Sequence, residues 1–470
     1  MMYWLCVQLT WKMAGQLLFR FLNPATLIIT PHYWWAVFNF RLATLVKGPS
    51  LVNNPYSWNK LGNVLYLESP AGVGFSYSLD GNVTTDDDET ALNNHHALLH
   101  FLDKFPEYEG RKLYVTGESY GGVYVPTLAL LLKDSPRFKL RGIAVGNGLT
   151  SYKLNDNSFL YYIRYHGFIG GSSWNDLLAK CCADQCSTWW CAFTDNKTRE
   201  CQRIISQLAE GPLKGINRYN IYSKCAGGVD RLFQQSMPSR RSVGENSSTR
   251  QPSNPYIRHD FGDMFRDNHY MKFLRDLKSA LRRNLTTRLT VACVDDTLIR
   301  SYLNSPVVRR LINVKPDVPK EWDICSDEVN GKYIRTYDDL SEQYMKLLQS
   351  RISTLIYNGD IDVAFNYLGG EMFVDNLKLK PTLSRRFWLY TESDGTKQIG
   401  GYWKMFESHG SILTYATVRG AGHKVPADKP AAAFQLINTF INEGSSVERK
   451  SKKIHLISLL CVISFFISSL

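Results

Sequence analysis

Short segments rich in β-branched and aromatic residues alternate with helical stretches from Asn63 onward, and this alternation most constrains the fold. The expected buried strands are 64–70, 112–119, 140–148, 353–360 and 411–420. Helical patterns occupy 88–105, 125–134 and 431–443. Such alternation predicts the α/β class, with a mostly parallel sheet covered by helices on both faces.

The alternation stops between residues 151 and 335, a region that we interpret as a cap inserted into the sheet domain. The region holds a cysteine cluster and a polar stretch with the Pro, Ser and Arg content of an exposed loop. The catalytic core would then be formed by residues 48–150 and 336–443, which is compatible with one large domain. Residues 1–47 fit no part of this pattern, and residues 444–470 form a basic spacer followed by a hydrophobic tail.

Ten cysteines and four glycosylation sequons indicate the secretory pathway. A zinc site is the alternative for the cysteines, but Cys181 and Cys182 are adjacent, whereas zinc ligand pairs are usually spaced by two to four residues. The sequons place acceptor asparagines at Asn82, Asn196, Asn246 and Asn284. We therefore expect disulfides and glycans, and neither a metal nor a cofactor.

The two ends of the chain give different signals. The first residues lack an early positive charge, and polar residues interrupt their apolar run, so no intact signal peptide is predicted. Residues 454–470 are apolar or small except for His455, and they follow a basic spacer and the small residues 444–446. That order favours a GPI-attachment signal over a retained transmembrane anchor, because a basic flank beside the body would favour a cytosolic body.

The segment Gly117-Glu118-Ser119-Tyr120-Gly121 matches G-x-S-x-G between a predicted strand and a predicted helix. Glycines permit the tight turn that lifts a serine hydroxyl clear of the backbone. A serine needs a base to become a nucleophile, and the base needs an acid to orient it. Ser119 is therefore the predicted nucleophile of an α/β-hydrolase fold.

The base and its acid should follow in the order Asp, His at later strand ends. His423 lies in a glycine-flanked turn after the last predicted strand, and it is the candidate base. Asp360 and Asp362 lie at the carboxyl end of the predicted strand 353–360. Turn chemistry is the competing explanation for these aspartates, and it is stronger for Asp360 than for Asp362.

Several motifs resemble the serine carboxypeptidase family, and within it the lysosomal cathepsin A branch. They are NVLYLESPAGVGFSYS, TGESYGG, AVGNGL, YNGDID and GAGHKVPADKPAAAF, in this order. The resemblance covers about residues 48–442 and implies Ser119, Asp362 and His423 as the triad. It also implies release of C-terminal amino acids from peptides through an acyl-enzyme, with the Tyr120 amide as an oxyanion donor.

The resemblance implies further roles and partners. Glu118, when protonated, would donate a hydrogen bond to the substrate carboxylate, which implies an acidic working pH. The implied disulfides are Cys181–Cys201, Cys182–Cys186 and Cys225–Cys293, which leaves Cys325 over. The expected partners are peptide or protein C-termini. A homodimer and membrane attachment through the tail are further expectations. The expected location is the lysosome or the extracellular space.

One family tract, W-L-N-G-G-P-G-C-S-S, has no counterpart here. It would supply a second oxyanion amide, an asparagine that binds the substrate carboxylate, and the partner of Cys325. The first strands would then be missing or replaced. Either the sequence is misassembled at its start, or the protein is divergent.

Three functions remain open: a carboxypeptidase, an acyltransferase using the same triad, and a catalytically impaired homologue that binds or stabilises other glycoproteins. A nucleic-acid function is not expected. The net charge is +12, but Lys and Arg are scattered and form no basic stripe with stacking aromatics.

Overall fold

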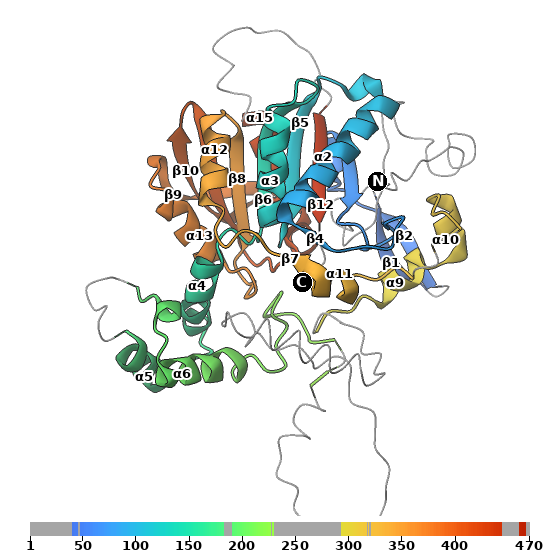
Figure 1. Ribbon diagram of the computed structural model, residues 1–470. Helices are drawn as coiled ribbons and strands as arrows, with labels where there is room; N and C mark the ends of the chain where they lie inside the picture. Colours follow the sequence, from blue (N-terminus) through green and yellow to red (C-terminus); the bar gives the residue numbers. More distant parts are fainter. Residues whose placement is uncertain are drawn as a thin grey trace, which may run out of the picture. The chain divides into compact units, whose positions relative to one another are not determined.

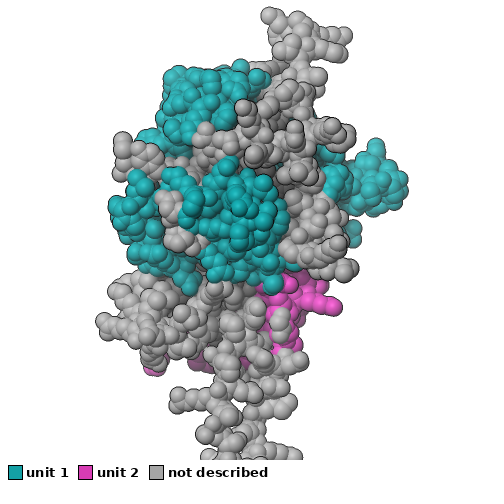
Figure 2. Space-filling view, turned by 90° about the vertical axis from the view of Figure 1, so that its right-hand side faces the viewer, with its two compact units in different colours: residues 1–158, 296–470 teal, residues 159–295 magenta. Residues whose placement is uncertain are grey.

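The computed structural model describes residues 40–45, 48–182, 190–226, 228–229, 293–316, 318, 321–443 and 460–466. They form two compact units, one from the described parts of 1–158 and 296–470 and the other from those of 159–295 (Figure 2). The second unit is shorter than the predicted cap at 151–335, because the described parts of 151–158 and 296–335 belong to the first unit.

An eight-stranded sheet is the centre of the first unit, in the order β3-β12-β5-β6-β8-β11-β10-β9 (Figure 1). Neighbours from β3 to β11 pair in parallel, and β9 and β10 close one edge as an antiparallel hairpin. The strands are β3 (Asn63–Glu68), β5 (Lys112–Glu118), β6 (Lys139–Gly146), β8 (Ser353–Gly359), β9 (Lys380–Thr391), β10 (Lys397–Ser408), β11 (Ser411–Val418) and β12 (Leu460–Phe466). All five predicted strands and the α/β class are confirmed.

The helices of the first unit include the three that the sequence predicts, at α2, α3 and α15. They are α2 (Asp87–Lys104), α3 (Gly121–Lys133), α9 (Thr297–Leu303), α10 (Pro306–Leu311), α11 (Asp327–Lys332), α12 (Ser341–Gln349), α13 (Tyr367–Asn376), α14 (Val425–Asp428) and α15 (Pro430–Glu443). Short 3-10 turns occur at Trp58–Lys60 and Pro106–Tyr108. Two small two-stranded sheets complete the unit: β1 (Phe40–Leu45) with β2 (Gly48–Asn53), and β4 (Thr85–Asp86) with β7 (Tyr333–Ile334).

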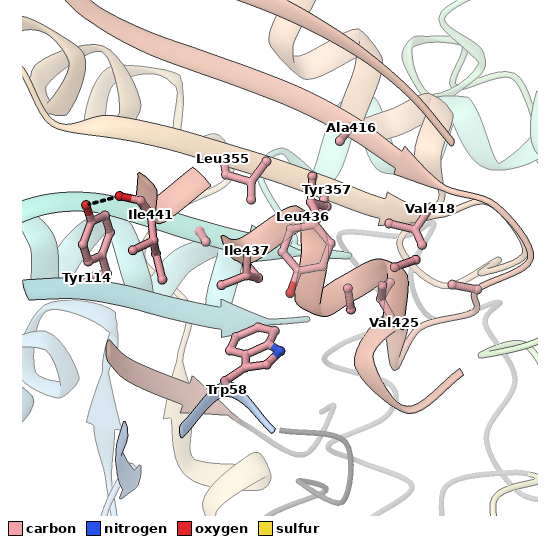
Figure 3. Packing of buried hydrophobic residues seen from close by; sticks show 14 of the residues in the cluster. Trp58, Tyr114, Leu355, Tyr357, Ala416, Val418, Val425, Leu436, Ile437 and Ile441 are labelled. Atoms are coloured by element: carbon pink, nitrogen blue, oxygen red, sulfur yellow. Dashed lines mark hydrogen bonds between the residues drawn. The ribbon is translucent and has the colours of Figure 1, made fainter. Parts of the chain in front are cut away.

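Apolar packing holds α15 against the sheet. Leu436, Ile437 and Ile441 of α15 are almost fully buried in one cluster with sheet residues such as Tyr114 and Leu355 (Figure 3). The Tyr114 hydroxyl also donates to the Ile441 carbonyl at 3.1 Å, so the ring buries its apolar body without leaving its polar end unsatisfied. Helix α3 packs on β5 and β6, and α2 and α12 pack on α3.

The hydrophobic tail contributes a strand to the sheet. β12 pairs in parallel with β3 on one side and with β5 on the other. A strand inside the sheet cannot also be a cleaved or membrane-embedded segment, so this pairing is an alternative to the GPI signal or anchor expected from the sequence. In the part of the chain described, no helix is long and apolar enough to cross a membrane.

The second unit contains short helices joined by disulfides. Its elements are the end of α4 (Tyr152–Tyr165), α5 (Gly171–Cys181), a 3-10 turn (Phe193–Asp195) and α6 (Arg199–Glu210). The predicted bonds Cys181–Cys201 and Cys225–Cys293 are confirmed.

The predicted bond Cys182–Cys186 is wrong. Cys182 bonds Cys191, with 5.8 Å between their Cα atoms, a separation that a disulfide readily spans. Cys191 is buried, and its amide donates to the Tyr161 hydroxyl. Its sulfur lies 3.8 Å from the carbonyl oxygen of Cys181, the last residue of α5. Cys186 lies outside the described residues. Cys325 forms no disulfide with any described cysteine.

The four sequons stay predictions. Asn82 is exposed, and Asn196 is partly buried, with its side chain bonded to the Thr198 amide at 2.9 Å. Asn246 and Asn284 lie outside the described residues.

Removing residues 444–470 should strongly destabilise the protein, because β3 would lose its sheet neighbour and β5 would become an unpaired edge. We expect a chain ending at Glu443 to aggregate or to melt roughly 10 °C or more below the full chain. Replacing only the spacer 444–453 by Gly and Ser is the matched control and should not change the melting temperature. Equal melting of the truncated and full chains would instead favour the anchor.

Candidate active site

Ser119 lies in a turn between β5 and α3 that is held from both sides. Its φ is 61°, a left-handed value that is uncommon for a residue other than glycine. Its amide donates to the Gly146 carbonyl at 3.1 Å, and its carbonyl accepts from the Leu149 amide at 2.9 Å. A Cβ on Gly122 would lie 2.2 Å from the Leu149 carbonyl oxygen, so only glycine allows this close approach. The strand–turn–helix context that the G-x-S-x-G motif requires is therefore present.

Asp362 and His423 meet at the ends of β8 and β11. The Nδ1 atom of His423 lies 2.8 Å from Oδ2 of Asp362, and both side chains are buried. Burial opposes a charge on the imidazole, but the Asp362 charge and hydrogen bond outweigh it, so the pKa of His423 lies above its usual value. The sequence-based pairing of these two residues agrees with this geometry.

Asp360 has the turn role that the sequence left open. Its Oδ1 accepts a hydrogen bond from the Gly420 amide at 2.6 Å. It thus braces the loop that carries His423, and it leaves the orienting position to Asp362.

The Ser119 hydroxyl is buried and has no hydrogen-bond partner among the described residues. The structure therefore joins Asp362 to His423 and leaves Ser119, at the end of β5, without a hydrogen bond to the base. In hydrolases the bond between nucleophile and base is often long before the substrate binds and tightens afterwards.

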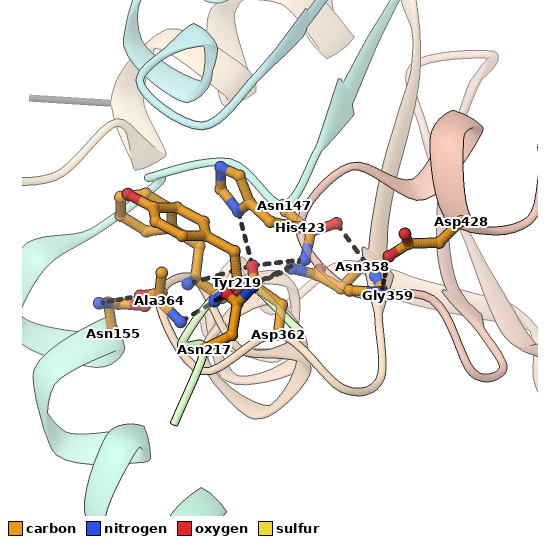
Figure 4. A network of polar contacts seen from close by, with 12 residues as sticks. Asn147, Asn155, Asn217, Tyr219, Asn358, Gly359, Asp362, Ala364, His423 and Asp428 are labelled. Atoms are coloured by element: carbon orange, nitrogen blue, oxygen red, sulfur yellow. Dashed lines mark hydrogen bonds and ion pairs between the residues drawn. The ribbon is translucent and has the colours of Figure 1, made fainter. Parts of the chain in front are cut away.

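Asn147 is a site residue that the sequence reasoning missed. It follows β6 with a φ of 41° and is fully buried. Its Nδ2 donates to Oδ2 of Asp362 at 2.8 Å, the same oxygen that faces His423, and its Oδ1 accepts from the Gly359 amide at 3.0 Å (Figure 4). An asparagine directly after a strand that neighbours the nucleophile's strand was the available signal.

Glu118 and Tyr120 flank Ser119. Burial raises the pKa of Glu118 to about 7, and the nearby charges of His423 and Lys424 only partly oppose that rise. Tyr120 precedes the first turn of α3, where backbone amides have no partner within the helix. Its hydroxyl donates to the buried carboxylate of Asp87 at 2.9 Å, which fixes the ring. Over the described residues, no group of three or more His, Cys, Asp or Glu side chains could hold a metal ion.

Replacing Asn147 by Asp tests its role. Aspartate tolerates the left-handed backbone and keeps the acceptor for Gly359, but its second oxygen would face Asp362. Two carboxylates at this distance share a proton, so Asp362 should be held correctly only at low pH. We expect a fluorophosphonate to label Ser119 about 10²-fold more slowly than in wild type at pH 7.5, with recovery toward pH 5.

Asn147→Gly is the matched control, because it accepts the backbone conformation and adds no charge. Its labelling should be slow and should rise with pH as in wild type. An Asn147→Asp profile parallel to that of wild type would show that Asn147 has no influence on Asp362.

The chain is similar to known proteins in its sequence and in its fold. The family description "Serine carboxypeptidase" matches residues 40–443, and the match starts inside the segment 1–47 that the sequence analysis left unmatched. The chain is 42% identical over 399 residues to the lysosomal protective protein of Mus musculus, covering 84% of this chain and 78% of that protein. It is 33% identical over 403 residues to serine carboxypeptidase ctsa-4.1 of Caenorhabditis elegans, covering 84% and 77%. A solved structure of Kex1(delta)p, a prohormone-processing carboxypeptidase from Saccharomyces cerevisiae, shares the fold with a TM-score of 0.58 at 20% identity, covering 87% of this chain and 80% of that one. By sequence and by fold, the chain belongs to the serine carboxypeptidase family.

Proposed function

We propose that this chain is a serine-type carboxypeptidase that releases the C-terminal amino acid from peptides through an acyl-enzyme. The observation that carries the proposal is the buried Glu118 directly beside Ser119. Because its raised pKa keeps this acid neutral below about pH 7, it can donate a hydrogen bond to a carboxylate without repelling it. A neutral acid in this position suits an enzyme that must bind a terminal carboxylate next to its nucleophile.

The reaction would use the site residues in two steps. His423 takes the proton of the Ser119 hydroxyl, and Oγ attacks the last peptide carbonyl while the Tyr120 amide stabilises the oxyanion. His423 then gives the proton to the leaving amino group. Water attacks the resulting ester in the same way and releases the shortened peptide. Asp362, supported by Asn147, keeps the imidazole in the tautomer that accepts the proton.

A catalytically impaired homologue that binds other glycoproteins is the second candidate. It is favoured by the lack of a counterpart to the family tract W-L-N-G-G-P-G-C-S-S, which would supply a second oxyanion amide. The acyltransferase reading stays a prediction.

The disulfides of the second unit fit an oxidising compartment, so we place the protein in the secretory pathway or the lysosome. Release into the extracellular space, membrane attachment and homodimer formation are finer proposals. The pairing of β12 with β3 and β5 opposes attachment through the tail.

Labelling by a fluorophosphonate separates the two candidates. We expect the wild-type chain at pH 5.5 to be labelled on Ser119, and labelling to disappear in Ser119→Ala, because only an activated serine reacts at a useful rate. Mass spectrometry of the labelled peptide identifies the residue. A folded wild-type chain that resists labelling across pH 5–8 would support the impaired homologue.

Glu118→Gln should change the pH profile of hydrolysis. In wild type, kcat/KM for a peptide with a free C-terminus should fall as pH rises through about 7, because Glu118 ionises there. Glutamine is neutral at every pH, so the variant should lose this alkaline limb and keep the acid limb that belongs to His423. The same peptide as a C-terminal amide is the control, and its hydrolysis should show no such limb in wild type. An unchanged limb in the variant would assign it to another group.

A further inference from the structure

Asp87, the first residue of α2, is a fully buried carboxylate that joins three segments of the first unit. Its Oδ1 accepts hydrogen bonds from the hydroxyls of Tyr120 at 2.9 Å and Tyr333 at 2.7 Å. Its Oδ2 accepts from the backbone amides of Thr336 at 2.7 Å and Tyr337 at 3.3 Å. One side chain thus ties the start of α2 to the start of α3 and to the residues that follow α11.

The four hydrogen bonds compensate for the burial of this carboxylate. An ionised carboxylate is costly to remove from water unless donors replace the lost hydration. The amino end of the eighteen-residue helix α2 also favours a negative charge at this position. Each donor must stay in place to satisfy Asp87, so each donor is held in a fixed position in return.

Tyr120 connects this carboxylate to the turn that carries Ser119. It follows Ser119, whose φ is 61°, and it has helical angles of φ −62° and ψ −10° at the boundary of α3. Its buried ring packs edge-on against the rings of Tyr124, with 4.9 Å between centroids, and Tyr333, with 5.8 Å. Because a tyrosine side chain has only two ring torsions, a ring held at its hydroxyl and on its sides leaves little freedom to its own backbone.

We propose that Asp87 is a positioning residue for catalysis, which acts through the Tyr120 ring to hold the Tyr120 backbone amide where the oxyanion of the substrate develops. The proposal rests on the carboxypeptidase function proposed above, in which this amide is an oxyanion donor. A donor stabilises the transition state best when it is fixed before the reaction, because no energy is then lost in reorganisation. The sequence has no counterpart of the tract that would supply a second donor, so the position of this amide has more weight.

The alternative is a purely structural role, in which Asp87 only fastens α2 to its neighbours. The hydroxyls of Tyr120 and Tyr333 would contribute about equally to that role, since they donate to the same oxygen over similar distances. Positioning of the oxyanion donor depends on the Tyr120 hydroxyl alone. The two roles therefore predict different results when one hydroxyl is removed.

Tyr120→Phe and Tyr333→Phe form a matched pair, because each removes one hydroxyl from Oδ1 of Asp87 and keeps its ring. The readout is kcat/KM for a peptide with a free C-terminus, divided by kcat/KM for the same peptide with sulfur in place of the scissile carbonyl oxygen. Sulfur accepts hydrogen bonds weakly, so the wild-type ratio should be on the order of 10². We expect Tyr120→Phe to lower this ratio about tenfold, through kcat and not through KM, and Tyr333→Phe to change it less than about twofold. Their melting temperatures should fall by similar amounts.

Asp87→Asn tests the route through Tyr120. Asparagine keeps the size of the side chain, but a neutral acceptor binds the Tyr120 hydroxyl less strongly than a carboxylate does. We expect the oxygen-to-sulfur ratio to fall about fivefold in Asp87→Asn, and to fall no further when this change is added to Tyr120→Phe, where the connecting hydroxyl is already gone. If Tyr120→Phe does not fold, the ratio in Asp87→Asn decides alone, because a purely structural role would leave it unchanged.

Equal ratios in Tyr120→Phe and Tyr333→Phe, or a full additional effect of Asp87→Asn in the Tyr120→Phe background, overturn the positioning role. With a wild-type chain that is labelled on Ser119 and hydrolyses the peptide, these outcomes leave the proposed function intact. A folded wild-type chain that neither reacts with the fluorophosphonate nor hydrolyses the peptide overturns the carboxypeptidase proposal, and the role of Asp87 with it.

Discussion

The buried contact between Asp362 and His423 is the interaction on which the site depends. It joins loops that follow β8 and β11, adjacent parallel strands whose carboxyl ends lie at one edge of the sheet. A fully buried carboxylate needs partners, and Asp362 also accepts from the amide of Ala364 and from Asn147. The same hydrogen bonds therefore satisfy the buried charge and fix the imidazole.

The sheet makes this contact possible only if its parallel strands keep their register. β5, β6, β8 and β11 are consecutive neighbours, and each loop of the site follows one of them. β12 lies on the other side of β5, between β5 and β3. The strand that leads to Ser119 is therefore an interior strand because of a segment more than 300 residues away in the chain.

Burial gives the site its dependence on pH. Removing Glu118 from water favours its neutral form, whereas the Asp362 carboxylate favours the charged form of His423. The protonation of Glu118 is therefore set mainly by burial, whereas at His423 the charge and hydrogen bond of Asp362 outweigh the opposing effect of burial. A carboxypeptidase can use this difference, because it needs an acid that does not repel a carboxylate and a base that is oriented by one.

The sequence by itself determined the α/β class and the five core strands, because strand periodicity and glycine turns are local properties. The assignment of Ser119, Asp362 and His423, and of the disulfides Cys181–Cys201 and Cys225–Cys293, came from motifs that resemble the serine carboxypeptidases. Only the tertiary structure decided that Cys182 bonds Cys191, that Asp360 braces a turn, and that Asn147 supports Asp362. It also placed the apolar tail in the sheet, between β3 and β5. These pairings join residues far apart in the chain or choose between equivalent neighbours, and no local pattern records which strands will lie side by side.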